Sequence, residues 1–322
     1  MDVRVTRYSG GDTLHHFFQL VVSAALSCRG FIISAVRWKQ WSLPVRGSYR
    51  GWTALCLGLL PAVLPGQDTI TGRITACGSG AAVSYATVYH RRTGTGTLAD
   101  ATGDFQINLP AGTSDPDTLT ASSVGYRTKV IPFRRQEAPS AVCLEAATID
   151  LPTATATAQR FRRESHFGNR SKSRNIVSGW SVSPRNGAER GVRIRLPGKG
   201  DHILKIIRLH LAESTYDSLR LRFHFYGDAA PGPTDRPLHS WLVDVNQASG
   251  WVSVDVLADA VSLRDQVFVS VEVVEAWSDK PANQLFLSAG LLTEGLYFRD
   301  RPFGAWEQAN AGLSLQIVTL RE

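Results

Sequence analysis

Apolar and polar side chains alternate at every second residue over long stretches of the C-terminal part of this 322-residue chain. The apolar positions of the two clearest stretches are Leu219, Leu221, Phe223, Phe225, Val267, Val269, Val271 and Val273. A period of two places these side chains on one face of a β-strand, whereas a helix needs a period of 3.6. Turn-forming residues separate the stretches, so we expect residues 191–322 to form a jelly-roll-like β-sandwich.

Residues 67–158 show the same alternation in shorter stretches. Phe105, Ile107 and Leu109 alternate with polar residues, and turn residues recur between such segments. This spacing predicts an antiparallel β-sandwich with one solvated face per sheet. Within it, residues 100–103 are expected to form a hairpin turn, with Asp100 capping backbone N–H groups and Gly103 adopting a positive φ.

Short motifs follow one another along this segment in a recognisable order. They are Ile70-x-Gly72-x-Ile74, Ala86-x-Val88, Gly96-Thr97-x-x-Asp100-x-x-Gly103-x-Phe105 and Leu119-x-x-Ser122-x-x-Gly125-Tyr126. Residues 67–158 thereby resemble the carboxypeptidase-like regulatory domain of bacterial envelope proteins. The resemblance implies a seven-stranded transthyretin-like sandwich without peptidase chemistry, acting as a structural or interaction module.

Residues 187–322 carry a second, less specific resemblance. Its motifs include Phe223-x-Phe225-Tyr226, Gly250-Trp251-x-x-Val254-Asp255, Ser288-Ala289-Gly290 and Tyr297-x-Arg299 with Trp306. They are similar to the domain that follows the regulatory-like domain in a group of Bacteroidetes proteins. No catalytic residue is established for that group, so the resemblance implies none here.

Residues 45–66 have the layout of a secretory signal peptide. Arg46 and Arg50 precede an apolar stretch from Trp52 to Leu64 that is too short to span a bilayer, and small or turn-forming residues follow. We expect cleavage after Gly66 and therefore an exported protein of the periplasm, outer membrane or cell surface. Residues 1–44 are either an artefact of a misplaced start or a genuine extension.

Two of the four cysteines, Cys77 and Cys143, lie after the expected cleavage site, near the two ends of the first domain. An oxidising compartment would permit a disulfide bond between them. Two separate thiols are the alternative that the sequence leaves open.

Residues 159–190 are polar and basic, which predicts a solvated linker between the domains. The alternative is contact with an anionic surface such as lipid phosphates or acidic sugars. The whole chain carries a formal charge of +7, but residues 1–66 hold seven basic and two acidic side chains, leaving 28 basic against 26 acidic. The expected mature chain is nearly neutral, so we expect no nucleic-acid partner.

The sequence contains none of the usual signatures of a catalytic elbow, zinc site, phosphate loop or dinucleotide fold. The histidines of alternating strands, including His210 and His224, are expected to be solvated, and we expect no metal and no cofactor. Asp244, Asp255, Asp259 and Glu272 qualify as paired catalytic carboxylates only by residue type.

Tryptophan offers the candidate binding residues, because aromatic faces stack on sugar rings. Trp277 at a predicted strand end, Trp306 and Trp251 are the candidates. We expect a non-enzymatic envelope interaction module with an unidentified protein or glycan partner and no membrane-spanning segment in the mature chain. A carbohydrate-binding module is the alternative, and a contiguous exposed aromatic surface would favour it.

Overall fold

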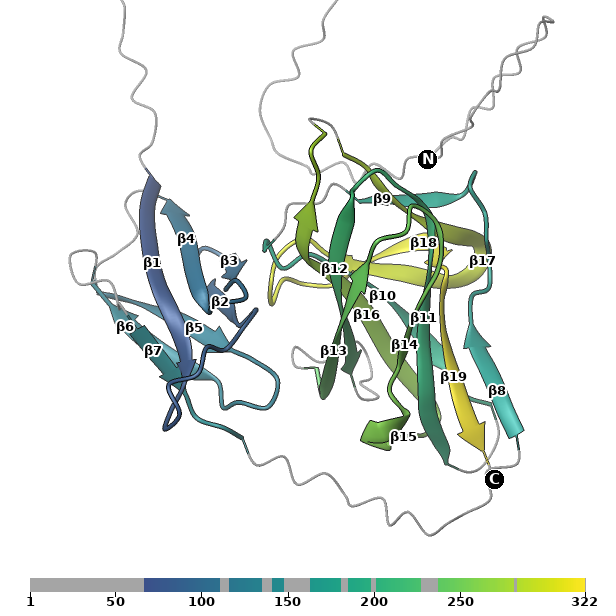
Figure 1. Ribbon diagram of the computed structural model, residues 1–322, viewed down its shortest axis with the longest axis horizontal. Helices are drawn as coiled ribbons and strands as arrows, with labels where there is room; N and C mark the ends of the chain where they lie inside the picture. The colour runs from purple at the N-terminus through teal and green to yellow at the C-terminus, as the bar shows by residue number, and fades with distance from the viewer. Residues whose placement is uncertain are drawn as a thin grey trace, which may run out of the picture. The chain divides into compact units, whose positions relative to one another are not determined.

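The computed structural model describes residues 67–110, 116–134, 141–147, 163–180, 185–197, 201–226, 237–280 and 283–321 (Figure 1). These residues form β-strands and one short 3-10 turn at Leu257–Asp259, which confirms the prediction of an all-β fold. The predicted signal peptide, the N-terminal extension and Cys28 and Cys56 lie outside the described residues. Within the described part, no helix is long and apolar enough to cross a membrane.

The N-terminal sandwich has two sheets. The first has the order β4-β1-β7 and the second the order β3-β2-β5-β6. The strands within the described part of this sandwich are β1 (Gln67–Ala76), β2 (Thr87–His90), β3 (Thr95–Leu98), β4 (Asp104–Pro110), β5 (Asp117–Ser122), β6 (Lys129–Phe133) and β7 (Ala141–Leu144). The predicted alternation is visible in β4, where Phe105, Ile107 and Leu109 are buried and their neighbours are more exposed.

The turn at residues 100–103 differs from the predicted hairpin in one respect. Asp100 accepts hydrogen bonds from the backbone N–H of Thr102 (2.8 Å) and of Asp104 (3.0 Å), and Gly103 has a φ of 82°. Both features follow the prediction. However, β3 and β4 belong to different sheets, so the turn carries the chain from one layer of the sandwich to the other.

The C-terminal sandwich is one curled sheet of twelve strands, counted in the part that the structure describes. They are β8 (Arg163–Gly168), β9 (Val177–Trp180), β10 (Glu189–Arg195), β11 (His202–Ser214), β12 (Ser218–Tyr226), β13 (His239–Val245), β14 (Gly250–Asp255), β15 (Ser262–Leu263), β16 (Gln266–Trp277), β17 (Leu285–Arg299), β18 (Glu307–Leu313) and β19 (Leu315–Arg321).

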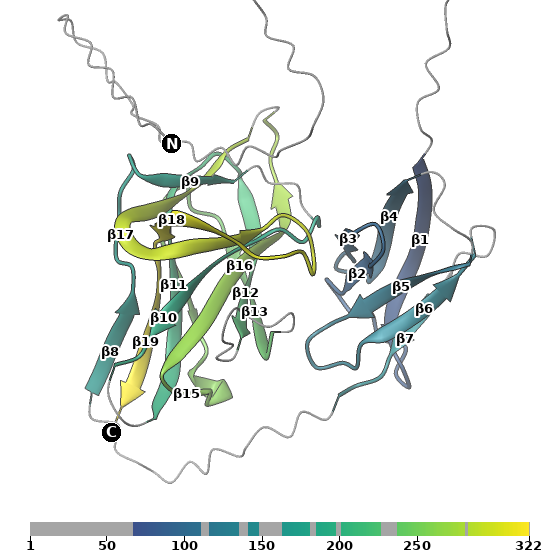
Figure 2. The same cartoon turned by 180° about the vertical axis from the view of Figure 1, so that it is seen from behind.

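Strand β17 joins the two halves of this sheet. Its beginning pairs with β11 and β9, and its end pairs with β10 (Figure 2). Strand β18 pairs with the middle and the end of β17. We call the strands around β11 (β8, β9, β14, β15 and β19) the β11 half, and those around β12 (β10, β13, β16 and β18) the β12 half. One hydrophobic core takes side chains from both halves, including Leu209 and Ile317 from the first and Phe223 and Val271 from the second.

Part of the predicted linker belongs to the C-terminal sandwich. Strand β8 pairs with β19, and β9 pairs with the beginning of β17. The sequence Arg163–Gly168 reads as polar because five of its six residues have short, polar or charged side chains, while Phe167 alone packs against the core. An edge strand with one apolar anchor carries too little alternation to be recognised.

Candidate functional site

Four charged side chains form a continuous row across the outer face of the β12 half. Arg222 of β12 lies opposite Glu272 of β16, Glu272 lies opposite Glu189 of β10, and Glu189 lies opposite Arg299 of β17. The strand order β12-β16-β10-β17 makes these residues direct neighbours. We call them the charged row, with two carboxylates in the middle and an arginine at each end.

The alternation of the strands explains why the row faces away from the core. In β16, Val271 and Val273 enter the core, so Glu272 between them points to the opposite face. In β12, Leu221 and Phe223 do the same for Arg222. Nevertheless Glu189 and Glu272 are only 3% and 2% exposed, so the row is buried on the outer side of the sheet.

Glu189 is the most heavily hydrogen-bonded member of the row. It accepts hydrogen bonds from Arg299 through Nε (3.0 Å) and Nη2, from the Ser270 hydroxyl (2.5 Å) and from the Tyr226 hydroxyl (2.9 Å). Burial opposes ionisation of Glu189, but the charge of Arg299 and the hydrogen bonds from Ser270 and Arg299 outweigh it and lower its pKa to about 2. Glu189 is therefore a fixed carboxylate at neutral pH.

Glu272 is held in a similar way on the other side. Arg222 donates from Nε (2.8 Å) and Nη2 (2.6 Å), and Nε2 of His224 lies 3.1 Å from the same carboxylate oxygen. The second ring nitrogen of His224 contacts Ser240 Oγ at 2.6 Å. Burial opposes ionisation of Glu272, and the charge of Arg222 with the His224 contact overcomes it, so its pKa is lowered.

Aromatic rings cover the Arg299 end of the row. The Arg299 guanidinium lies 4.6 Å from the centroid of the Trp306 ring, which also contacts Phe268 and Tyr226 edge-on. Gly191 makes room for this packing, because a Cβ there would lie 2.7 Å from the Phe268 ring. Trp306, a predicted binding residue, is thus part of the packing around a buried ion pair.

The other two predicted tryptophans lie elsewhere. Trp251 is half-buried on the outer face of the β11 half, where its ring contacts His210 at 4.9 Å. Trp277 ends β16 and is 44% exposed, with the Arg220 guanidinium 5.8 Å from its ring centroid. The ring contacts of Trp251 and Trp306 place them on different halves of the sheet, so the structure does not bring them together into one aromatic surface.

The carboxylates selected by residue type also lie apart. Asp244 forms a two-point ion pair with Arg220, Asp255 caps the backbone N–H of Leu257, and Asp259 accepts a hydrogen bond from the Trp241 indole. Only Glu272 belongs to the charged row. Among the described residues, no group of His, Cys, Asp and Glu has the arrangement of a metal site.

The expectation of solvated histidines is wrong for the C-terminal sandwich. His210 and His224 do face away from the core, but they are only 8% and 5% exposed. Alternation predicts the face of a side chain and not whether something covers that face. The same limitation hid the charged row. Arg222 and Glu272 each stand between two apolar residues, which is a weak sequence signal, but Glu189 and Arg299 each have a charged neighbour and give no such signal.

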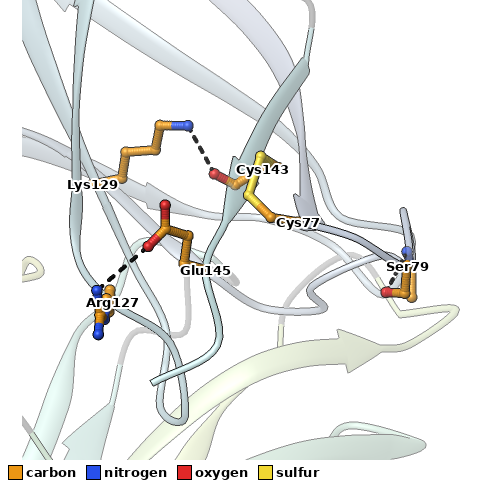
Figure 3. The surroundings of a disulfide bond; sticks show 7 residues. Cys77, Ser79, Arg127, Lys129, Cys143 and Glu145 are labelled. Atoms are coloured by element: carbon orange, nitrogen blue, oxygen red, sulfur yellow. Dashed lines mark hydrogen bonds and ion pairs between the residues drawn. A yellow bond between two sulfur atoms is a disulfide. The ribbon is translucent and has the colours of Figure 1, made fainter. Parts of the chain in front are cut away.

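A disulfide bond joins Cys77 and Cys143 in the N-terminal sandwich (Figure 3). Cys77 directly follows β1, and Cys143 lies in β7, which runs parallel to β1 with Thr75 opposite Cys143. The Lys129 ammonium donates a hydrogen bond to the Cys143 carbonyl oxygen (3.0 Å). The bond therefore fixes a short strand at the edge of the three-stranded sheet.

These features define an all-β protein with a disulfide-closed N-terminal sandwich and a C-terminal sandwich that buries a neutralised charged row. Residues 70–152 match the family model of the CarboxypepD_reg-like domain, which confirms the predicted resemblance of the N-terminal sandwich to that family. No curated protein matches the sequence.

Two solved structures show distant similarity. One contains the cysteine protease and lectin-like domains of Cwp84, a surface layer associated protein of Clostridium difficile, with 11% identity, a TM-score of 0.32, and coverage of 43% of this chain and 33% of that chain. This chain thus spans about a third of the length of that structure. The other is the clostridial cysteine protease Cwp84 after propeptide cleavage, with 8% identity, a TM-score of 0.33, and coverage of 81% and 73%. At these TM-scores neither similarity bears on the function.

Proposed function

We propose that this protein is a non-catalytic interaction module of the bacterial cell envelope that acts after export. The observation that carries the proposal is the match of residues 70–152 to the CarboxypepD_reg-like domain. The disulfide between Cys77 and Cys143 supports export, because such bonds persist in oxidising compartments and are rare in the cytosol.

The chemistry of the charged row supports a non-catalytic role. A general acid needs a carboxyl group whose pKa is raised toward neutrality, and a nucleophile needs an accessible oxygen. Glu189 and Glu272 have the opposite properties, since both are buried, held by arginines and shifted to lower pKa. Such a row holds four strands in register rather than exchanging protons with a substrate.

Export is tested on the protein from native cells. An envelope fraction is treated with an alkylating reagent before and after reduction, and the mature N-terminus is determined by mass spectrometry. We expect Gln67 at the N-terminus, and alkylation of Cys77 and Cys143 only after reduction. An intact Met1 with both thiols alkylated before reduction would contradict the proposal.

The interaction itself is tested by crosslinking in intact cells. A photoreactive residue is placed at Val130 or Leu242, which are 60% and 47% exposed on the edge strands β6 and β13. A reproducible adduct with one envelope protein from either position is expected. A protein that remains without an adduct from both edges would contradict a role in envelope assemblies.

A carbohydrate-binding module is the second candidate. It is favoured by Trp277, whose exposed ring stands at the end of β16 with one arginine beside it. A glycan array with the wild type and Trp277→Ala tests it directly. Binding that is lost in Trp277→Ala supports this candidate, and the absence of binding to any glycan removes Trp277 as a sugar site.

A further inference from the structure

A row of exposed cations follows β8 in the C-terminal sandwich. Between β8 and β9, Arg170, Lys172 and Arg174 are exposed and alternate with partly buried residues. Among the ion pairs of the described residues, none involves these three cations. Their charges are therefore not neutralised by a carboxylate of the described part of the chain.

The backbone that carries these cations is held firmly. The Asn169 side-chain amide donates to the Gly312 carbonyl (2.8 Å), and the Ser314 hydroxyl donates to the Ser171 carbonyl oxygen. The Ser288 hydroxyl donates to the Ser173 carbonyl (2.8 Å). Cations on such a segment are positioned in advance, so that binding an anion orders little additional chain.

Ser288 connects this segment to His210 of β11. Its hydroxyl gives its one proton to the Ser173 carbonyl, so at the 2.8 Å contact with His210 Nδ1 it must act as the acceptor. This arrangement assigns the proton of the neutral ring to Nδ1 and leaves Nε2 as an acceptor, and no hydrogen bond to Nε2 is present among the described residues. Burial first, and then the charges of Lys172 and Arg174, lower the pKa of His210, in keeping with this proximity.

Trp251 and Arg208 complete the surface. Trp251 lies opposite His210 on β14 with its ring 4.9 Å away, and Arg208 points from the same face of β11 two residues before His210. The Arg208 Nε is buried and has no hydrogen-bond partner in the described part. We define the basic patch as Lys172, Arg174, Arg208, His210 and Trp251.

We propose that the basic patch binds an acidic carbohydrate. The cations would pair with its carboxylate groups, the Trp251 ring would stack on a sugar ring, and Nε2 of His210 would accept a hydrogen bond from a hydroxyl. A lipid surface fits less well, because the exposed large apolar side chains in the described part all lie outside the patch. The inference rests on the proposed function as a binding module and places the site away from Trp277.

The test uses the full chain and oligomers of polygalacturonic acid as the probe. Affinity is measured by calorimetry at low and at raised salt, for the wild type and for Lys172→Gln/Arg174→Gln. We expect the double variant to bind at least about tenfold more weakly and with a smaller salt dependence. The matched control Arg134→Gln/Lys280→Gln removes two exposed cations that lie elsewhere in the chain, and it should bind like the wild type.

The aromatic contact needs a pair of variants, because Trp251 is partly buried. Trp251→Phe keeps a ring and should lose less affinity than Trp251→Leu, while thermal unfolding confirms that both variants are folded. The proposal would be overturned if Arg134→Gln/Lys280→Gln lost as much affinity for the acidic probe as Lys172→Gln/Arg174→Gln. It would also be overturned if uncharged dextran bound as tightly as the acidic probe.

Two further probes separate other polyanions from the proposed ligand. The proposal would be contradicted if oligothymidylate, or vesicles containing phosphatidylglycerol, bound more tightly than the acidic sugar. It would also be contradicted if the acidic sugar did not bind at all. These results would leave the proposed interaction module standing, since that role is decided by crosslinking at Val130 and Leu242 and not by sugar binding.

Discussion

Glu189 and Glu272 lie directly opposite each other on β10 and β16, each with an arginine on its far side. Two adjacent carboxylates repel each other, and their burial raises the cost of both charges. Arg299 and Arg222 therefore offset the free-energy cost of keeping both Glu189 and Glu272 ionised in the folded state. The integrity of the β12 half depends on all four members of the charged row.

Replacement of Glu189 by glutamine should destabilise the C-terminal sandwich strongly. Glu189→Gln leaves the Arg299 guanidinium buried, at 5% exposure, without its hydrogen-bonded carboxylate, which costs about 3–5 kcal/mol of unfolding free energy. Urea unfolding followed by tryptophan fluorescence measures this. Asp244→Asn is the control, because it removes a surface partner of Arg220 and should cost less than about 1 kcal/mol. Equal losses of unfolding free energy in the two variants would show that Glu189 stabilises the fold no more than a surface ion pair does.

The charged row should also make the C-terminal sandwich sensitive to acid. The pKa of Glu189 is lowered from 4.5 to about 2 in the folded state, so its contribution is complete above pH 4.5 and is lost as the pH falls toward 2. The shift corresponds to about 3 kcal/mol. Unfolding free energies measured from neutral pH down to about pH 3 should fall more steeply for the wild type than for Glu189→Gln. If the unfolding free energies of the two proteins fell with pH in parallel, the lowered pKa of Glu189 would be contradicted.

The turn between the two N-terminal sheets should tolerate only glycine at position 103. A Cβ at Gly103 would lie 2.4 Å from the Ile74 carbonyl oxygen, and the φ of 82° is unfavourable for other residues. Gly103→Ala should cost roughly 2 kcal/mol or more. Gly125→Ala separates the two effects, because Gly125 has a φ of 81° but no atom within 4 Å of its would-be Cβ. Hydrogen exchange of β1 peptides should rise more in the first variant, and an equal rise would contradict the steric part.

The disulfide should contribute mainly to the N-terminal sandwich. Cys77 and Cys143 are 66 residues apart in the sequence, and closing a loop of that length restricts the unfolded chain by about 4 kcal/mol. The Cys77→Ser/Cys143→Ser variant, or the reduced wild type, should lose protection from hydrogen exchange in β1 and β7 while β11 and β16 keep theirs. Unchanged exchange in β1 would contradict this role.

The sequence predicts local features of this fold well. The alternation from Leu219 to Tyr226 predicts β12, and the spacing of Asp100 and Gly103 predicts the capped turn and the positive φ. Both depend on residues close together in the chain. The resemblance of residues 67–158 to the regulatory domain predicts a whole sandwich, because motifs in a fixed order specify how the strands follow each other.

The site depends on strand pairing over long distances, and that is where sequence reasoning fails. Glu189 and Glu272 meet only because β10 pairs with β16 in one particular register, which no local pattern specifies. The basic patch similarly combines Lys172 from the predicted linker with His210 and Trp251. Cations in a polar segment predict a solvated connector until the hydrogen bonds of Asn169 and Ser173 are known.

Strand β17 pairs with the β11 half at its beginning and with the β12 half at its end. Neither half can release this fifteen-residue strand without removing a neighbour from the other. The C-terminal sandwich should consequently unfold as a single cooperative unit. A force applied to the β11 half would also load the β12 half, because β17 is hydrogen-bonded to both. If the module binds a partner under tension, the pairing of β17 with both halves would raise the force needed to unfold the C-terminal sandwich.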